Sequence, residues 1–207
     1  MPDALEKDPR PVWDRLQDVF PEREVEWRVQ SSGLGSEKPW ALVVCYIQGR
    51  AVQRRLDAVV GVPNWKAAYR EVSGGKGGMI CALSVRDGSD GEWVTKEDGA
   101  SFTGVESVKG GISDALKRAA SAGFGLGRYL YYLDSAFANI HTSRVAGGQR
   151  ITIKPAQNRE GTAWTGWWTP PALPEWAIPA DERAARKAAR EAAQNTSGDA
   201  YGDEPPL

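Results

Sequence analysis

The sequence predicts an α+β fold in which an antiparallel β-meander packs on one long amphipathic helix. Three strand-like runs, at 65–72, 79–86 and 92–97, follow one another with glycine- and aspartate-rich turns between them, as in consecutive hairpins. Directly after them, residues 104–133 carry apolar side chains at steps of three and four, which is the period of a helix. Five interior glycines cost about 1 kcal/mol each relative to alanine, so we expect this helix either to contact a neighbour closely or to break near Gly123. Strands that pack on one side of a long helix form a layered domain.

Shorter patterns predict the elements that precede the meander. Residues 8–20 carry the apolar spacing of a short helix that ends at Pro21, and residues 24–30 alternate apolar and polar side chains as a half-buried strand does. After them we expect, in order, a loop at 31–38, a strand at 40–48, a helix at 50–60 and a turn at 61–64.

The chain changes character after residue 133. We expect a short strand at 150–155 and then an extended arm at 162–179, because prolines interrupt regular pairing. Four tryptophans lie in this arm, and we expect them to dock on the protein in preference to stacking on nucleobases. Residues 180–194 predict a charged helix, and residues 195–207 have the composition of a disordered acidic tail.

Charge is distributed unevenly along the 207 residues. The chain has 26 Lys and Arg against 27 Asp and Glu, a net charge of −1, which excludes a generic polycation. Residues 40–133 nevertheless hold twelve basic and nine acidic side chains, a net of +3, whereas residues 1–39 have a net of −3. A basic block in a nearly neutral chain favours a nucleic-acid surface within the predicted meander and helix.

No segment predicts export or membrane insertion. The start of the chain lacks a basic and then apolar signal region, and no apolar run approaches the ~18 residues of a spanning helix. We therefore expect a cytoplasmic protein without a membrane partner. Cys45 and Cys81 both lie in strand-like runs, and we expect them to be reduced structural thiols in preference to a disulfide.

Three motifs that could carry chemistry have simpler interpretations. SGGKGG at 73–78 is followed by a strand, whereas a phosphate loop opens a helix, so we interpret it as a hairpin loop. GFGLG at 123–127 lies within or after a helix and so fails the dinucleotide-binding pattern. His141 lies in a polar loop without nearby cysteine ligands, and no acidic pair is evident. The sequence therefore predicts no catalytic residue, no metal site and no cofactor.

Two stretches carry a family resemblance. SDALKRAASAGFGLGRYLY at 113–131 resembles the signature helix of the Rad52 family of single-strand annealing proteins, in which a T/S-D-x-L-K-R run precedes a glycine-interrupted aliphatic segment. VVCYIQG at 43–49 is similar to a second motif of that family, and a helix and an aromatic residue follow it in the same order. The ending GFGLGRYLY is most similar to the DNA damage response A proteins of radiation-resistant bacteria and to phage annealing proteins. The resemblance spans roughly residues 28–133.

This resemblance implies a DNA groove and assigns residues to it. Tyr46 matches a strand tyrosine that lines the groove, and Lys117 and Arg118 match the paired basic residues of the signature helix. Lys109 matches a basic position one to two turns earlier, and Arg28 matches a basic residue on the preceding strand. The resemblance thus implies phosphate contacts from one strand pair and one helix.

The sequence departs from the family at Ser121, where many relatives carry a further arginine. Arg128 is expected to compensate, because on a continuous helix it would lie within about 20° of Lys117. The alternative is that these cations only solvate an amphipathic helix, with Asp114 paired to Arg118 four residues later.

The activity that the resemblance implies is single-stranded DNA binding without sequence preference and strand annealing in recombination and repair, with no ATP. It also implies homo-oligomers, as rings or helical assemblies. Two alternatives stay open. One is a factor that protects DNA 3′ ends and anneals poorly, and the other, from a different class, is a DNA-processing enzyme such as a nuclease.

On this interpretation the chain divides into four parts. Residues 1–23 form an N-terminal helix, residues 24–135 the single-stranded-DNA-binding annealing domain and residues 136–179 a tryptophan- and proline-rich extension. Residues 180–207 form the charged helix and acidic tail, a candidate docking segment for a host or phage recombination partner.

Overall fold

The computed structural model contains the expected mixture of helices and antiparallel sheets. It describes residues 8–35, 38–75, 77–102, 107–133, 135–155 and 161–198. Its helices are α1 (Val12–Leu16), η1 (Glu22–Glu24), α2 (Gly49–Val59), η2 (Val62–Asn64), α3 (Ser107–Phe124), η3 (Arg128–Tyr132), η4 (Glu175–Ala177) and α4 (Ala180–Gly198), where η marks a 3-10 helix. Its strands are β1 (Val25–Leu34), β2 (Pro39–Ile47), β3 (Trp65–Val72), β4 (Gly78–Val85), β5 (Val94–Ser101), β6 (Ala136–Phe137), β7 (Asn139–His141), β8 (Gln149–Ile153) and β9 (Trp164–Thr169).

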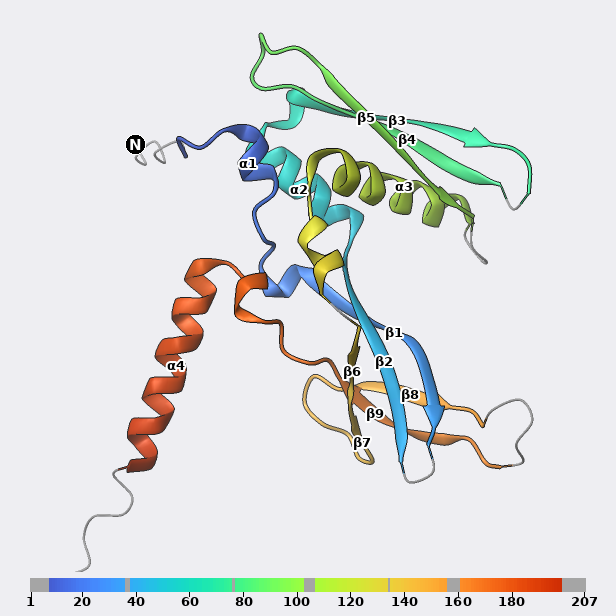
Figure 1. Ribbon diagram of the computed structural model, residues 1–207, viewed down its shortest axis with the longest axis vertical. Coiled ribbons are helices and arrows are strands. Elements are labelled where there is room, and N and C mark those ends of the chain that lie inside the picture. The colour runs from blue at the N-terminus through green and yellow to red at the C-terminus, as the bar shows by residue number, and fades with distance from the viewer. Residues whose placement is uncertain are drawn as a thin grey trace, which may run out of the picture.

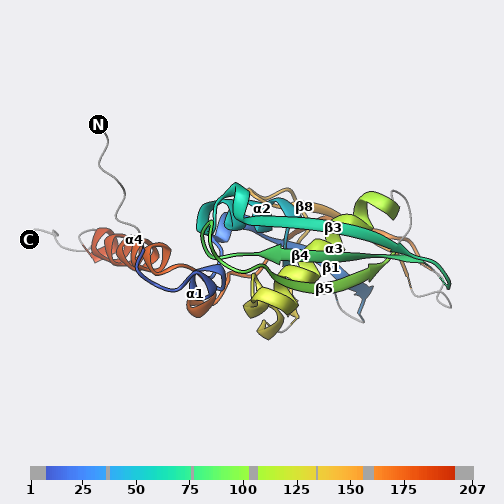
Figure 2. The same cartoon turned by 90° about the horizontal axis from the view of Figure 1, so that it is seen from above.

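The predicted meander is confirmed as an antiparallel sheet in the order β3-β4-β5. On its central strand, Cys81, Leu83 and Val85 are all 0% exposed. They share one face because alternate residues of a strand point the same way, and that face shares its core with Ala115 and Ala119 of α3. In Figure 1 the sheet covers α3, and Figure 2 shows the helix beneath the three strands.

The helix is shorter than the predicted span of 104–133, so one continuous helix is not confirmed, whereas the expected alternative of a break near Gly123 agrees with where α3 ends. α3 has 18 residues and ends at Phe124. Gly125 and Gly127 follow with φ of +81° and +68°, a left-handed backbone that glycine adopts at low cost and that commonly ends helices. The chain then turns into the short helix η3, so the apolar spacing beyond Phe124 belongs to a separate element.

The β1–β2 hairpin extends well beyond the predicted strands. β1 continues to Leu34, so the first half of the predicted loop at 31–38 is strand. A bulge between Val29 and Ser31 shifts the register within it. At Gly33 a Cβ atom would lie 2.7 Å from the ring of Trp40, so the glycine allows that ring to cross the partner strand. β6 pairs with the other edge of β2.

The tryptophan-rich segment is partly regular, which corrects the prediction of an extended arm. The prolines of this segment begin at Pro170, after the six residues of β9, so they do not interrupt it. β9 is the central strand of a sheet in the order β7-β9-β8. Trp168 is 3% exposed and packs with Ile151 and Ile153 against Val43 of β2. This tryptophan docks on the protein, as expected.

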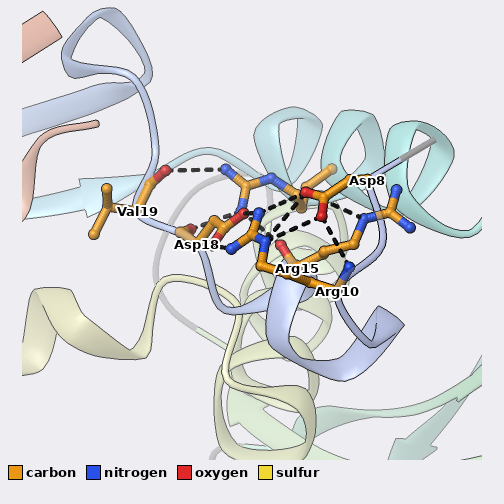
Figure 3. Close-up of polar contacts among 6 residues, drawn as sticks. Asp8, Arg10, Arg15, Asp18 and Val19 are labelled. Atoms are coloured by element: carbon orange, nitrogen blue, oxygen red, sulfur yellow. Dashed lines mark hydrogen bonds and ion pairs between the residues drawn. The ribbon is translucent and has the colours of Figure 1, made fainter. Parts of the chain in front are cut away.

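Polar contacts fasten the N-terminal segment to α2 (Figure 3). α1 is five residues long, much shorter than the predicted 8–20. Arg10 pairs with Asp8 and Asp18, each at 2.7 Å, and its hydrogen bonds to Asp8 lower the pKa of that carboxyl to about 2. Arg55 of α2 donates to the carbonyl oxygens of Asp18 and Val19 at 2.6 and 3.1 Å. The segment is thereby held on α2 beyond the end of the short helix.

Helix α4 projects from the rest of the protein but is anchored at its base (Figure 1). Glu182 accepts a hydrogen bond from the backbone amide of Glu22 at 3.0 Å, and Arg186 forms an ion pair with the side chain of Glu22. The helix reaches Gly198, beyond the predicted end at 194, and most of the predicted acidic tail lies outside the described residues. No helix in the described part of the chain is long and apolar enough to cross a membrane.

Candidate nucleic-acid interface

One face of the β1–β2 hairpin carries the predicted strand residues. The register pairs Glu26 with Tyr46 and Arg28 with Val44, and directly paired and alternate residues of a hairpin lie on the same face. The opposite face includes Val43 and packs against the β7-β9-β8 sheet. The hairpin therefore separates a polar face with Arg28 and Tyr46 from an apolar core.

The ring of Tyr46 lies between two cations from different elements. The guanidinium carbon of Arg28 on β1 is 5.8 Å from the ring centroid, and the ammonium nitrogen of Lys117 on α3 is 5.6 Å from it. Both distances are within the range of cation–π attraction. The structure thus brings together three of the six predicted site residues, from three elements, around one aromatic ring.

A carboxylate holds this tyrosine from the hairpin side. The Tyr46 hydroxyl donates to Glu26 at 2.7 Å, and the side-chain amide of Gln48 donates to the same carboxylate at 2.6 Å. Burial raises the pKa of Tyr46, and the hydrogen bond to Glu26 raises it further. The hydroxyl therefore stays neutral and its ring orientation is fixed. Sequence analysis missed Glu26, because only the strand register places it opposite Tyr46.

The paired basic residues of the signature helix point to different neighbours. Lys117 forms an ion pair with Asp114 at 2.7 Å, whereas Arg118 forms one with Asp98 of β5 at 3.2 Å. Successive helix residues are 100° apart, so one cation reaches the hairpin while the next reaches the meander. The alternative pairing of Asp114 with Arg118 was wrong, since Asp114 contacts Lys117.

Arg128 does not lie on the helical face that was expected for it. Because α3 ends at Phe124, the wheel argument that placed Arg128 near Lys117 was wrong. Its Nε donates to the carbonyl oxygen of Ser121 at 2.9 Å, and its Nη2 donates to that of Ala122 at 2.7 Å. The sixth predicted residue, Lys109, is exposed in the first turns of α3.

The two ends of the site differ. At the end near α2, a Cβ atom on Gly49 would lie 3.0 Å from the hydroxyl of Ser113, so α3 is in close contact with the start of α2, which follows β2. At the other end, Phe137 pairs with Leu42 on the face of Tyr46, and its ring meets Trp40 edge-on at 6.3 Å. Phe137 and Trp40 are 67% and 38% exposed. In the sequence, the only indication that these rings share a face with Tyr46 was the alternation of Trp40, Leu42, Val44 and Tyr46 along one strand.

Two cations lie beside the Tyr46 ring, and two exposed rings, Trp40 and Phe137, continue along the same face. Cations and aromatic rings on one face are typical of surfaces that bind single-stranded nucleic acid, because phosphates pair with the cations and bases stack on the rings. The face is thus a candidate nucleic-acid interface on an α+β protein. Comparison with known proteins gives its family. The chain belongs to the Rad52/22 family of double-strand break repair proteins, whose family model matches residues 9–147.

Two relatives extend this match over most of the chain. The single-stranded DNA-binding protein DdrA of Deinococcus radiodurans is 32% identical over 176 residues, which cover 83% of this chain and 70% of the relative. The protein of the same name from Deinococcus deserti is 32% identical over 178 residues, or 84% and 73% of the two chains.

Proposed function

We propose that this protein binds single-stranded DNA without sequence preference and anneals complementary strands in recombination and repair, without ATP or a catalytic step. The observation that carries the proposal is the Tyr46 ring between Arg28 and Lys117 on a chain of the Rad52/22 family. The names of the two DdrA relatives support single-stranded DNA as the ligand.

The chemistry of a single strand suits this face. Each nucleotide offers one phosphate charge and one base whose flat surface stacks on any aromatic ring, whatever the sequence. Arg28 and Lys117 would hold phosphates beside Tyr46, and the exposed rings of Trp40 and Phe137 would continue the track along the hairpin. Annealing requires that the base edges stay free, so contacts to phosphate and to base faces are the ones it permits.

Carboxylates already pair with both basic residues of the signature helix. Lys117 has Asp114 within 2.7 Å and Arg118 has Asp98 within 3.2 Å, so a phosphate must compete with each of them. We expect one groove to bind weakly and a continuous track to require many copies. The outer strands of the meander, β3 and β5, offer edges of the kind through which subunits pair. We therefore propose homo-oligomers, as rings or helical assemblies.

Further assignments belong to the same proposal. Lys109 and Arg118 are proposed as additional phosphate contacts, and Arg128 as one whose guanidinium first has to leave the end of α3. We place the annealing domain at residues 24–135, with the N-terminal helix, the extension and the charged helix as its neighbours. Because the ligand is DNA, we propose that the protein works in the cytoplasm, with residues 180–207 available to a recombination partner.

The test replaces Lys117 and Arg118 together with alanine. Each lost phosphate contact lowers the slope of log affinity against log salt by about 0.7 for single strands, so the double substitution should reduce it by about 1.4, for oligonucleotides of any sequence. The matched control replaces Lys187 and Arg190 on α4, which removes the same charge away from the groove and should leave the slope unchanged. An equal slope for the protein and its groove variant would overturn the proposed site.

The alternatives separate in an annealing assay with complementary oligonucleotides. Faster pairing that needs no nucleotide supports annealing. Tight binding without faster pairing favours the end-protection factor. Shortened or otherwise altered strands after incubation with a divalent cation would indicate a DNA-processing enzyme.

A further inference from the structure

The β7-β9-β8 sheet has an outer face that lies apart from the proposed DNA groove, the hairpin face with Arg28, Tyr46 and Lys117. Along its strands Trp168 and Ile151 point toward the β1–β2 hairpin, whereas Trp167 and Arg150 point away from it. The register places His141, Trp167 and Arg150 in one row across β7, β9 and β8. The outer face of this sheet thus carries an aromatic ring between a histidine and an arginine.

Trp167 has the surroundings of a stacking residue. Its side chain is half-buried, whereas the neighbouring Trp168 is 3% exposed in the core. The guanidinium carbon of Arg144, on the exposed connection between β7 and β8, is 5.6 Å from the Trp167 ring centroid. Arg150, opposite Trp167 in the register, is exposed as well. A base that takes the place of Arg144 on the ring would leave its own phosphate beside two cations.

The charge of this region has one sign. In the described segments 135–155 and 161–174 the basic side chains are Arg144, Arg150 and Lys154, and neither segment contains Asp or Glu. Such a stretch is unusual in a chain whose net charge is −1. Polar groups accompany the cations, since the hydroxyls of Thr152 and Thr165 lie 3.2 Å apart on the same face. The groove, by contrast, has a carboxylate beside Tyr46 and beside Lys117.

We propose that the outer face of the β7-β9-β8 sheet is a second contact surface for single-stranded DNA, on which a base stacks on Trp167 and phosphates pair with Arg144 and Arg150. This inference rests on the proposed function for its ligand but assigns a different surface. The sheet packs on the side of the hairpin opposite Tyr46, so the two surfaces face different directions. β8 and β9 also lie beyond residue 147, where the family match ends.

The first experiment titrates the full-length protein with oligothymidylate and follows tryptophan fluorescence. Stacking on Trp167 quenches its emission, so Trp167→Phe, which keeps an aromatic ring in the sheet, should lose a large share of the quenching. The matched control is Trp176→Phe, since Trp176 is 50% exposed and lies next to Glu175. Quenching should be the same in that variant and in the unaltered protein.

The second experiment measures affinity. Replacing Arg144 and Arg150 with alanine should reduce the salt slope by about 1.4, and Trp167→Ala should weaken binding on the order of tenfold. The double variant Arg144→Ala with Arg150→Ala leaves the core of the sheet intact. If Trp167→Ala fails to fold, the salt slope of this double variant therefore tests the proposed surface. Unchanged quenching in Trp167→Phe together with an unchanged slope in the arginine variant overturns the proposal.

Two more arms identify the ligand and separate the two proposals. Equal quenching of Trp167 by blunt duplex DNA, whose base faces are stacked inside, would overturn a single-strand surface. A change in oligomer size in Trp167→Phe would do so too, because the face would then be an interface between copies. In a Tyr46→Ala and Lys117→Ala background, remaining Trp167 quenching supports the second surface. An unchanged salt slope in Lys117→Ala with Arg118→Ala would overturn only the groove, whereas loss of Trp167 quenching in that Tyr46→Ala and Lys117→Ala background would overturn the second surface.

Discussion

Arg128 lies against the carbonyl of Ser121, to which its Nε donates at 2.9 Å, and it thereby closes the end of the helix that precedes it. The last four carbonyls of a helix have no partner within it, and a basic side chain that folds back can satisfy them. A second bond, from Nη2 to the carbonyl of Ala122 at 2.7 Å, fixes the guanidinium there. The arginine that was expected to extend the DNA groove therefore has a structural role at the end of α3.

Arg128→Met should accordingly lower the free energy of unfolding by about 1 kcal/mol, since it removes two hydrogen bonds from a largely exposed charged donor. Urea unfolding measures this loss, and Arg183→Met on the exposed side of α4 provides the comparison. Because Arg128 is also proposed as a phosphate contact, the slope of log affinity against log salt should fall by about 0.7 in the same variant. An unchanged salt slope with reduced stability would leave Arg128 a structural role alone.

Asp114→Asn should strengthen DNA binding, because it removes the carboxylate that competes for Lys117 at 2.7 Å. An exposed ion pair is worth about 0.2–1 kcal/mol, so the affinity for a single strand should rise about 1.5- to 5-fold. Fluorescence anisotropy at fixed salt measures the change. Asp181→Asn at the start of α4 removes the same charge elsewhere, and an equal gain from both variants would point to net charge as the cause.

Two substitutions of Tyr46 distinguish the contribution of its ring to DNA affinity from that of its hydroxyl. Tyr46→Phe keeps the ring between Arg28 and Lys117 but leaves Glu26 without the hydroxyl at 2.7 Å, whereas Tyr46→Ala removes the ring as well. If the ring provides the contact surface, the phenylalanine variant should bind within about twofold of the original protein. The alanine variant should lose on the order of tenfold in affinity. Equal losses in both variants would show that the hydroxyl and its carboxylate carry the effect.

The stability of the fold should fall at high pH through Tyr129. Burial raises the pKa of this phenol from 10.0 to about 12, and its oxygen accepts a hydrogen bond from the amide of Phe20. The unfolded chain then loses its proton at a lower pH than the folded chain does. The contribution of Tyr129 is therefore complete below pH 10.0 and declines toward about 12.

Urea unfolding at several pH values in this window measures that decline. In Tyr129→Phe the decline should be shallower, because one titrating group has been removed. Tyr131, which is 72% exposed in the same short helix, gives the matched control as Tyr131→Phe. An identical pH dependence in Tyr129→Phe and in the original protein would contradict this assignment.

Local patterns were sufficient for much of the fold. The alternation and turn residues of 65–97 predicted the meander, and the apolar spacing of 50–60 predicted α2, because each pattern reports one buried face. The end of α3 was predictable only as an alternative, a break near Gly123, because the apolar spacing continues past Phe124 while the helical backbone does not. Gly125 and Gly127 have positive φ in the structure, but glycine is also tolerated inside helices, so its presence alone could not decide.

Site residues that belong to a recognisable sequence motif could be predicted, whereas residues that join the site only through the fold could not. Tyr46 and Lys117 came from separate motifs, and the fold brings them within 5.6 Å of each other, measured from the ammonium nitrogen to the ring centroid. Glu26 and Asp98 were missed because their proximity depends on strand register and on how α3 lies across the meander. β9 was missed because the prediction applied the effect of the prolines, which begin at Pro170, to the whole segment, although they follow the strand. Its partner β8 was predicted from its own pattern.

The anchored base of α4 has a mechanical consequence. Glu182 and Arg186 fix the helix to Glu22, in the 3-10 turn that leads without a break into β1 and hence toward Arg28. Nineteen helical residues span about 28 Å, so a rotation of about 10° at the base would move the far end by about 5 Å. The length of α4 therefore amplifies any rotation of the strand that carries Arg28 into a larger displacement at the far end of the helix. A fluorescent dye attached near that end would report a tilt of the hairpin on DNA binding.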